Sequence, residues 1–284
     1  MCRFTFYRGE LLQLSDLVTE PENSLIHQSY AAQEREEPLN GDGFGLAWYV
    51  KDQREPAFFR SITPAWSNQN LECLARVLRS DCVLAHVRAA SHGLEVTEKN
   101  CHPFTCDRFA LMHNGEVGAF PAVRRRLLES LSDEAFSRIR GTTDSEHLFA
   151  AFMDELRKEE PSDGCSAMAA ALERAIARIL ELVERHGDGV PSFLNVVVTD
   201  GEAAVVSRFT SSDSEPAHSL YVSHGARYVC EDGVCRMEAA EGASRAVLVS
   251  SEPLTDDVHW DPVPENHVVS IHEGLGVDVR EMNV

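Results

Sequence analysis

The chain has 284 residues, of which 43% are hydrophobic, 25% charged and 7% aromatic. This composition is typical of a globular protein and not of a disordered or fibrous one. A formal net charge of -20 repels phosphate backbones and anionic lipid headgroups, so we expect neither nucleic acid nor a membrane as a partner. The first residues lack the features of a secretory signal, and no later run resembles a membrane span, which predicts a cytoplasmic protein.

The first predicted element is a strand over residues 2–7 (CRFTFY), in which Phe4 and Phe6 fall on one face. An ordered strand that begins at the second residue is unusual, because chain ends fray unless something ties them down. This start suggests that position 2 has a specific role.

A glycine-punctuated turn at residues 41–45 leads into a second predicted strand, residues 44–50. Apolar residues at helical spacing predict a helix over residues 68–79, and CVLAHV at residues 82–87 predicts a buried strand with Arg88 at its end. Residues 109–112 form a further short strand, after which Asn114-Gly115 would ordinarily be a hairpin turn.

Two amphipathic helices follow, one capped by Thr143 or Asp144 and running through Leu156, the other spanning residues 168–183. The remainder is rich in strands, predicted at residues 193–199, 203–209, 219–222, 246–250 and 268–272. Because no repeat or linker divides the chain, the sequence predicts one layered α+β domain over residues 1–284.

Eight cysteines would suit a disulfide framework only in a small secreted protein, so we expect them to be reduced thiols. They are Cys2, Cys73, Cys82, Cys101, Cys106, Cys165, Cys230 and Cys235. The pairs Cys101/Cys106 and Cys230/Cys235 lack the short paired spacings of a zinc site. The sequence therefore predicts neither a bound metal nor another cofactor.

Cys2 could act as a nucleophile that carries its own base. Removal of Met1 would leave a thiol and a free α-amine on the same residue, with ordinary pKa values of about 8.5 and about 8. The amine could then take the thiol proton through a water near neutral pH. Taken alone, the position proves little, because a small residue there more often has no such role.

Four motifs give this cysteine a context. HVRAASHG (86–93), NCHPF (100–104), HNGEV (113–117) and GTTDSEH (141–147) follow Cys2 in that order. Together they closely resemble the class II glutamine amidotransferases, which are N-terminal-nucleophile hydrolases. The resemblance implies a four-layer αββα sandwich and a single glutamine amidotransferase type 2 domain.

The resemblance also implies roles for individual residues. Cys2 would be the nucleophile, Arg88 would clamp the α-carboxylate of a glutamyl group, and Asp144 would hold its α-ammonium. Asn114 and Gly115 would form the oxyanion hole. The plainer alternatives are a surface ion pair for Arg88, a helix cap for Asp144 and a hairpin turn for Asn114-Gly115.

His92 and His102 match family positions near the site. A histidine in a loop is more often structural than catalytic, so we expect both to support the substrate pocket. Ala89 departs from the pattern, because many ammonia-channelling members have an aromatic residue after the arginine. Closure over the substrate is therefore expected to differ from theirs.

A synthase domain that receives ammonia normally adds roughly 100 residues or more, and this chain has no room for one. The start MCRF and the stretches at residues 24–30, 38–49 and 250–255 resemble a stand-alone branch that acts on γ-glutamyl thiol compounds. That branch includes the glutaminase-like subunit of the fungal glutathione-degrading complex. It also includes the bacterial amidohydrolase that acts on γ-glutamyl-hercynylcysteine sulfoxide in ergothioneine synthesis.

The leading hypothesis is hydrolysis of a small γ-glutamyl substrate through a thioester at Cys2, which releases glutamate. One alternative is a glutaminase subunit that supplies ammonia to a separate synthase. A second alternative is a non-catalytic γ-glutamyl-binding protein. The sequence leaves open a partner subunit or a homo-oligomer.

Overall fold

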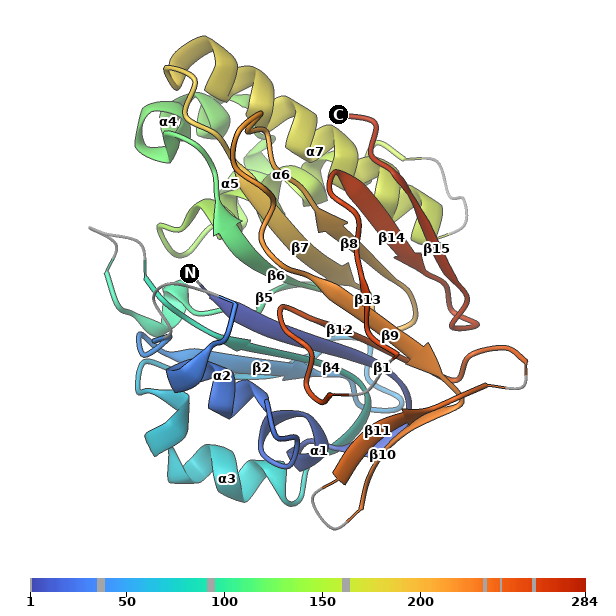
Figure 1. Cartoon of the computed structure of the whole chain (residues 1–284). Coiled ribbons are helices and arrows are strands. Elements are labelled where there is room, and N and C mark those ends of the chain that lie inside the picture. Colours follow the sequence, from blue (N-terminus) through green and yellow to red (C-terminus); the bar gives the residue numbers. More distant parts are fainter. Residues whose placement is uncertain are drawn as a thin grey trace.

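The computed structural model describes residues 2–34, 39–90, 95–159, 164–231, 234–240, 242–256 and 259–284. Two β-sheets pack face to face, and helices cover the outer face of each, as Figure 1 shows. The layers are therefore α, β, β and α, and the predicted sandwich is confirmed. In these described ranges, no helix is long and apolar enough to cross a membrane.

The lower sheet in Figure 1 contains β1 (Arg3–Gln13), β2 (Phe44–Trp48), β3 (Ala57–Ser61), β4 (Arg79–Val87), β9 (Tyr221–Gly225), β12 (Ala246–Ser250) and β13 (Asp261–Pro262). Their order is β13-β9-β12-β1-β4-β2-β3, with antiparallel neighbours throughout. The small helices on this side are α1 (Ser15–Val18), α2 (Leu25–Ala31), η1 (Ala65–Ser67) and α3 (Gln69–Ala75). The first strand of the chain thus lies in the middle of its sheet.

The upper sheet contains β5 (Phe104–Cys106), β6 (Phe109–Glu116), β7 (Phe193–Thr199), β8 (Ala204–Arg208), β14 (His267–Ile271) and β15 (Val277–Glu281). Their order is β15-β14-β8-β7-β6-β5. The covering helices are α4 (Phe120–Ser130), α5 (Asp133–Arg138), α6 (Asp144–Leu156) and α7 (Gly164–His186), and η2 (Glu98–Asn100) precedes β5. A separate hairpin joins β10 (Arg227–Glu231) to β11 (Val234–Glu238).

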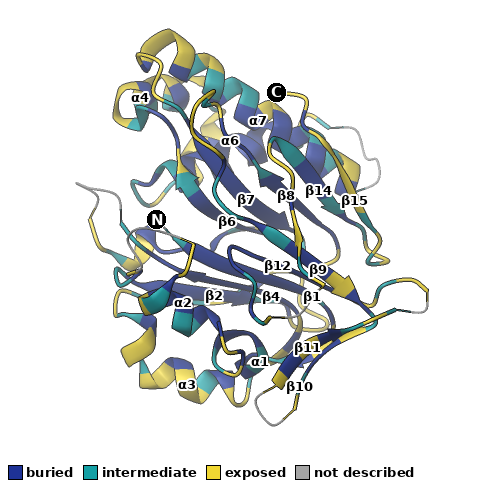
Figure 2. Cartoon of the chain, in the orientation of Figure 1, coloured by how far each residue is buried: buried dark blue, intermediate teal, exposed yellow. Residues whose placement is uncertain are grey.

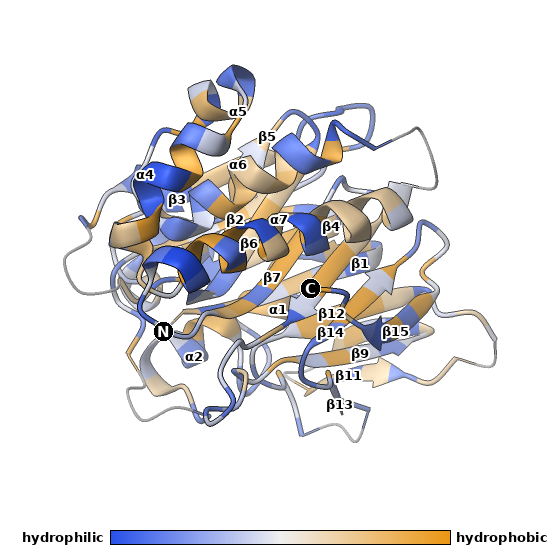
Figure 3. Ribbon diagram, turned by 90° about the horizontal axis from the view of Figure 1, so that it is seen from above, coloured by the Kyte–Doolittle hydropathy of each residue, from blue (hydrophilic) through white to orange (hydrophobic). Residues whose placement is uncertain are grey.

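The alternation of side chains along β1 explains the layers. Phe4 and Phe6 pack in the apolar cluster between the two sheets, whereas Tyr7 packs in the cluster on the opposite face, with residues of α1 and α3. A third cluster fills the space between the upper sheet and α6 and α7. Figure 2 shows that both sheets are largely buried, and Figure 3 shows the hydrophobic residues that run along their strands.

The helices of the upper layer form where apolar residues recur with helical spacing. Thr143 is the N-cap of α6, because its hydroxyl accepts a hydrogen bond from the Glu146 N–H at 3.2 Å. In α7 the buried face includes Leu172, Ile176 and Ile179, as the predicted period requires. Both predicted helices are therefore confirmed, with Thr143 as the capping residue.

Most predicted strands are confirmed to within a few residues, but four elements differ in extent. The strand predicted at residues 2–7 is longer and runs from Arg3 to Gln13 as β1. The helix predicted over residues 68–79 starts where expected, with the Asn68 side chain accepting from Leu71 N–H as its cap, but it ends at Ala75, and Arg79 already belongs to β4. The strand predicted at residues 109–112 is longer and continues to Glu116. The strand predicted at residues 219–222 begins two positions later, at Tyr221.

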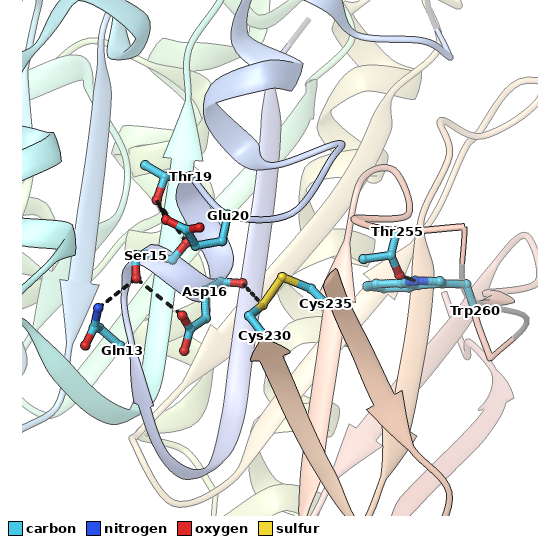
Figure 4. Close-up of a disulfide and its surroundings, with 9 residues drawn as sticks. All are labelled: Gln13, Ser15, Asp16, Thr19, Glu20, Cys230, Cys235, Thr255 and Trp260. Atoms are coloured by element: carbon cyan, nitrogen blue, oxygen red, sulfur yellow. Dashed lines mark hydrogen bonds between the residues drawn. A yellow bond between two sulfur atoms is a disulfide. The ribbon is translucent and has the colours of Figure 1, made fainter. Parts of the chain in front are cut away.

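The expectation that all cysteines are reduced is wrong for one pair. Cys230 and Cys235 form a disulfide, and they lie directly opposite each other in the β10–β11 hairpin (Figure 4). The antiparallel register brings the two Cα atoms within 4.0 Å, close enough for a bond between the strands. The Cys230 sulfur also lies 3.5 Å from the Asp16 carbonyl oxygen on α1.

Candidate active site

The pairing of β1 with β4 brings Cys2 to Arg88. Arg3 lies opposite Val87 in this antiparallel pair, and Phe4 lies opposite His86. One further step along the same register places Cys2 opposite Arg88, and the Cys2 thiol donates to the Ala89 carbonyl oxygen at 3.5 Å. Cys2 and Arg88 therefore meet where β1 begins and β4 ends, in the middle of the lower sheet.

Strand alternation directs the candidate residues into the space between the sheets. Phe4 points inward from β1, so Cys2, two positions earlier, lies on the same face. Met112 points inward from β6, so Asn114 also faces this space. The His86 imidazole on β4 donates across the gap to the His113 carbonyl oxygen at 3.2 Å. This hydrogen bond ties the two sheets together beside the site.

Arg88 is a buried cation with unused hydrogen-bonding capacity. It is only 2% exposed, one guanidinium nitrogen donates to the Glu95 carbonyl oxygen at 3.3 Å, and Nη1 has no partner among the residues that the structure describes. Within the described ranges, no carboxylate lies within salt-bridge distance of it. A buried charge without a counterion is costly, so this guanidinium is suited to binding an anion. The surface ion-pair alternative is therefore wrong.

Main-chain hydrogen bonds fix the backbone that carries Arg88. Arg88 N–H donates to the Gly43 carbonyl oxygen at 2.8 Å, and Asp42 N–H donates to the Arg88 carbonyl oxygen at 2.9 Å. The Asp42 carboxylate also accepts from Ala90 N–H at 2.8 Å. The turn before β2 thus holds the segment that faces Cys2, and Asp42 is a contributor that the sequence reasoning missed.

Asn114 and Gly115 lie inside a strand, so the hairpin-turn alternative is wrong. In β6 they pair with Asn195 and Leu194 of β7. The Asn114 side chain is fully buried, and in the described part of the chain neither its amide nitrogen nor its oxygen has a partner. Gly115 has φ +143°, and a Cβ there would approach the Phe193 carbonyl oxygen to 1.8 Å, so no other residue fits without a shift.

The Asp144 carboxylate connects the start of α6 to the end of β6. One oxygen accepts from Val117 N–H at 2.9 Å, and the other accepts from Ser145 N–H at 2.8 Å. Since each carboxylate oxygen can accept more than one hydrogen bond, capacity remains for an ammonium group. The cap of α6 is Thr143, so capping does not account for Asp144.

Burial raises the pKa of the Cys2 thiol to about 11. A backbone hydrogen bond with Ala89 and the positive charge of Arg88 oppose this shift, whereas the negative charge of Asp144 adds to it. All three groups therefore act on the sulfur. A thiol with this pKa is protonated at neutral pH, so its attack on a carbonyl requires a base.

His102 is buried beside the site and uncharged. Its ring stacks on His86 with 4.1 Å between centroids, and neither ring nitrogen has a partner within the described ranges. Burial, followed by the charge of His86, lowers the pKa of His102 well below its usual value. His92 lies outside the described residues.

Two further residues near the site were missed by the sequence reasoning. Burial raises the pKa of the Cys101 thiol, while the positive charge of Arg88 opposes the shift and the Cys2 thiolate adds to it. Asn100 accepts from Thr142 N–H at 2.9 Å and donates to the Glu95 carbonyl at 2.9 Å, which links two of the predicted motifs. The signal available in the sequence was that both residues belong to the motif NCHPF, which accompanies the other motifs. Over the described residues, no cluster of His, Cys, Asp and Glu could hold a metal ion.

Residues 10–283 match the family model of the class II glutamine amidotransferases. The chain belongs to this family, and the predicted class of amidohydrolase enzyme is confirmed.

Among individual proteins, the chain is 40% identical over 294 residues to a probable glutamine amidotransferase, DUG3, of Saccharomyces cerevisiae, covering 95% of this chain and 82% of the relative. It is 27% identical to a γ-glutamyl-hercynylcysteine sulfoxide hydrolase of Mycolicibacterium smegmatis, covering 96% of each chain. A solved glutamine aminotransferase class-II domain protein from Silicibacter pomeroyi superposes with a TM-score of 0.70 and 28% identity over the full length of both chains.

Proposed function

We propose that the protein hydrolyses a γ-glutamyl amide bond and that the Cys2 thiol is the nucleophile. The observation that carries this proposal is the set of buried, unpartnered polar atoms around Cys2. Arg88 offers a free donor for a carboxylate, and Asn114 offers a free amide for an oxyanion. The names of the related proteins, a glutamine amidotransferase and a γ-glutamyl hydrolase, support the same bond type.

Substrate binding would begin with the amino-acid end of the glutamyl group. The Arg88 guanidinium would bind the α-carboxylate and the Asp144 carboxylate the α-ammonium, so the buried cation and the half-buried anion would each gain a partner. Fixing both groups selects the L-glutamyl configuration and directs the δ-carbonyl toward Cys2. Such positioning removes much of the entropy cost of bringing thiol and carbonyl together.

The chemical step would use the α-amine of Cys2 after removal of Met1. As the sulfur bonds to the δ-carbonyl carbon, the thiol proton passes to the amine, directly or through a water. The negative charge that develops on the carbonyl oxygen is stabilised by the Asn114 side-chain amide and the Gly115 N–H. The amine then returns the proton to the leaving nitrogen. Water cleaves the resulting γ-glutamyl thioester, which releases glutamate and restores the thiol.

As the substrate we favour a γ-glutamyl thiol compound, such as glutathione or γ-glutamyl-hercynylcysteine sulfoxide, from which the leaving group is an amine larger than ammonia. The similarity to the mycobacterial hydrolase covers nearly the whole of both chains. We place this activity in the cytoplasm and, as a proposal, in a single domain over residues 1–284. A glutaminase that supplies ammonia to a separate synthase would instead act on glutamine, and its activity would require a partner.

The direct test is release of glutamate from glutathione, glutamine and γ-glutamyl-hercynylcysteine sulfoxide by the purified protein. We expect turnover of at least one γ-glutamyl thiol compound and its loss in Cys2→Ala. Cys73→Ala is the matched control, because Cys73 is an exposed thiol. Glutamate release from none of the three substrates, or equal release by Cys2→Ala, would contradict the proposal.

A further inference from the structure

A buried ion pair lies directly beside Cys2. The Arg3 Nε atom is 2.7 Å from the Glu252 Oε1 atom, and the two side chains are only 2% and 1% exposed. Removing two charges from water is costly, and replacement of such a pair by apolar residues is often neutral or stabilising. Stability alone therefore gives little reason for this pair.

The remaining hydrogen bonds of the pair hold main chain next to the nucleophile. Arg3 Nη1 donates to the Cys2 carbonyl oxygen at 3.0 Å, and Arg3 Nη2 donates to the Glu34 carbonyl oxygen at 3.4 Å. The Glu252 carboxylate accepts from Gln33 N–H at 2.9 Å and from Glu34 N–H at 3.2 Å. The pair thus joins three segments that are far apart in the sequence.

The residues before Glu252 hold the same end of β1. Phe4 N–H donates to the Ser251 hydroxyl at 3.1 Å, and Ser251 N–H donates to the Phe4 carbonyl oxygen at 3.0 Å. Thr5 and Ser250 share a hydroxyl hydrogen bond at 2.9 Å. Chain ends fray unless they are tied down. These contacts supply such ties within three residues of Cys2.

Arg3 does not reach the substrate side of the sheet. Because successive side chains alternate, Arg3 points away from the face that carries Cys2 and Phe4. Its effect on Cys2 is exerted through the Cys2 carbonyl and through charge. Arg3 and Glu252 are therefore candidates for positioning residues, which do not contact the reacting atoms.

We infer that the Arg3–Glu252 pair fixes the Cys2 backbone so that its α-amine and thiol stay in place at the substrate side of the sheet, and that it keeps the charge around that amine balanced. This inference rests on the proposed function, in which the amine takes the thiol proton. The charged or titratable groups around Cys2 are its own thiol, Arg3, Glu252, Arg88, Asp144 and Cys101. With the pair intact, the two arginines and the two carboxylates offset one another.

Single and double variants separate geometry from charge. In Glu252→Gln an uncompensated cation would remain near the amine, and the acid limb of the kcat/KM profile should move to lower pH by roughly one unit. In Arg3→Met an uncompensated carboxylate would remain, and the limb should move to higher pH. The double variant Arg3→Met/Glu252→Gln should return the limb to its original position. All three should lose kcat by roughly 10- to 100-fold, because the amine is displaced.

The Michaelis constant should change little in these variants, because neither residue is expected to touch the substrate. Arg3→Lys keeps the charge but loses the forked contact, so it should lower kcat without moving the limb. Asp154→Asn is the matched control: it breaks the buried contact of Asp154 with Arg178 in the helix layer and should lower stability alone. Single-variant kcat values within twofold of the original, or limbs that shift in the same direction, would overturn the inference.

A second readout works without turnover. The rate of Cys2 alkylation by iodoacetamide can be measured as a function of pH by mass spectrometry, on protein shown to be folded by circular dichroism. Opposite displacements of this profile in Glu252→Gln and Arg3→Met would support the role of the pair even if no γ-glutamyl substrate is cleaved. Unchanged profiles in folded variants would refute it. Absence of glutamate release from the unmodified protein would refute only the proposed function.

Discussion

The space between the two sheets contains two regions that differ in polarity and in how far their hydrogen-bonding groups are satisfied. In the middle, Phe6, Met112 and Val197 pack together with almost no exposure to solvent. Toward one end of the two sheets, Arg88 and Asn114 are also buried, but each keeps a polar atom without a partner among the described residues. The middle contributes hydrophobic stabilisation, whereas the end costs stability. The apolar region can therefore hold rigid a polar region that is incomplete without a ligand.

The largest effect on stability is expected in the apolar region. Phe6→Ala should lower the free energy of unfolding by about 3–5 kcal/mol, because it removes a fully buried ring and leaves a cavity. Urea unfolding would measure this change. The control is Phe136→Ala, which removes a ring that is 54% exposed and should change stability by less than about 0.5 kcal/mol. Equal losses in the two variants would contradict the assignment of the core.

In the polar region the corresponding change should act on catalysis. Asn114→Ala should lower kcat by roughly 100- to 1000-fold, because the oxyanion loses one donor, while the thermal midpoint should hardly change. Asn195→Ala is a matched control, since Asn195 lies opposite Asn114 on β7 and donates to the His218 and Ser219 carbonyls. We expect that variant to lose stability and keep most of its kcat. Steady-state kinetics and thermal unfolding would separate the two outcomes.

Removal of the Arg88 guanidinium should weaken substrate binding without lowering the stability of the fold. Arg88→Met should raise KM for a γ-glutamyl substrate by roughly 30-fold or more, because the carboxylate loses a buried charge partner worth about 2 kcal/mol or more. The free energy of unfolding should stay constant or rise by about 1 kcal/mol, because an unpaired buried charge is removed. A marked loss of stability with unchanged KM would show that Arg88 is structural.

The smallest effect concerns the stacked histidines. Burial lowers the pKa of His86 to about 3 and that of His102 well below its usual value, so both rings stay neutral in the folded state. Below about pH 6.5 the unfolded chain binds protons that the folded chain does not, so stability falls as the pH falls. Each ring contributes up to about 1.4 kcal/mol per pH unit in this range. Urea unfolding at several pH values should show a shallower acid loss in His102→Gln; equal slopes would contradict the account.

Much of the fold could be predicted because its signals are local. The alternation of Phe4 and Phe6 defined the first strand, and apolar residues four apart defined α7. The candidate site could be assembled only through the family resemblance, because its members lie just before β1, just after β4, on β6 and at the start of α6. Gly115 shows the limit of local signals: an Asn-Gly pair is a common turn, yet here its conformation is held within a strand by β7.

Two other features depend on which strands pair and in which register. Cys230 and Cys235 become neighbours only because a short hairpin sets them opposite each other. Arg3 and Glu252 are separated by most of the chain, and they meet because β12 pairs with β1. No periodicity in the sequence reports either pairing.

The central claim is that a free amino-terminal cysteine performs the reaction. It is tested most directly by the mass of the intact protein, followed by peptide mapping, after exposure to the glutamine-like electrophile diazo-oxo-norleucine. The account predicts loss of Met1 and a single adduct on the Cys2 sulfur, and no adduct in Cys2→Ala. A protein that retains Met1, or that carries its adduct on another residue, would contradict it.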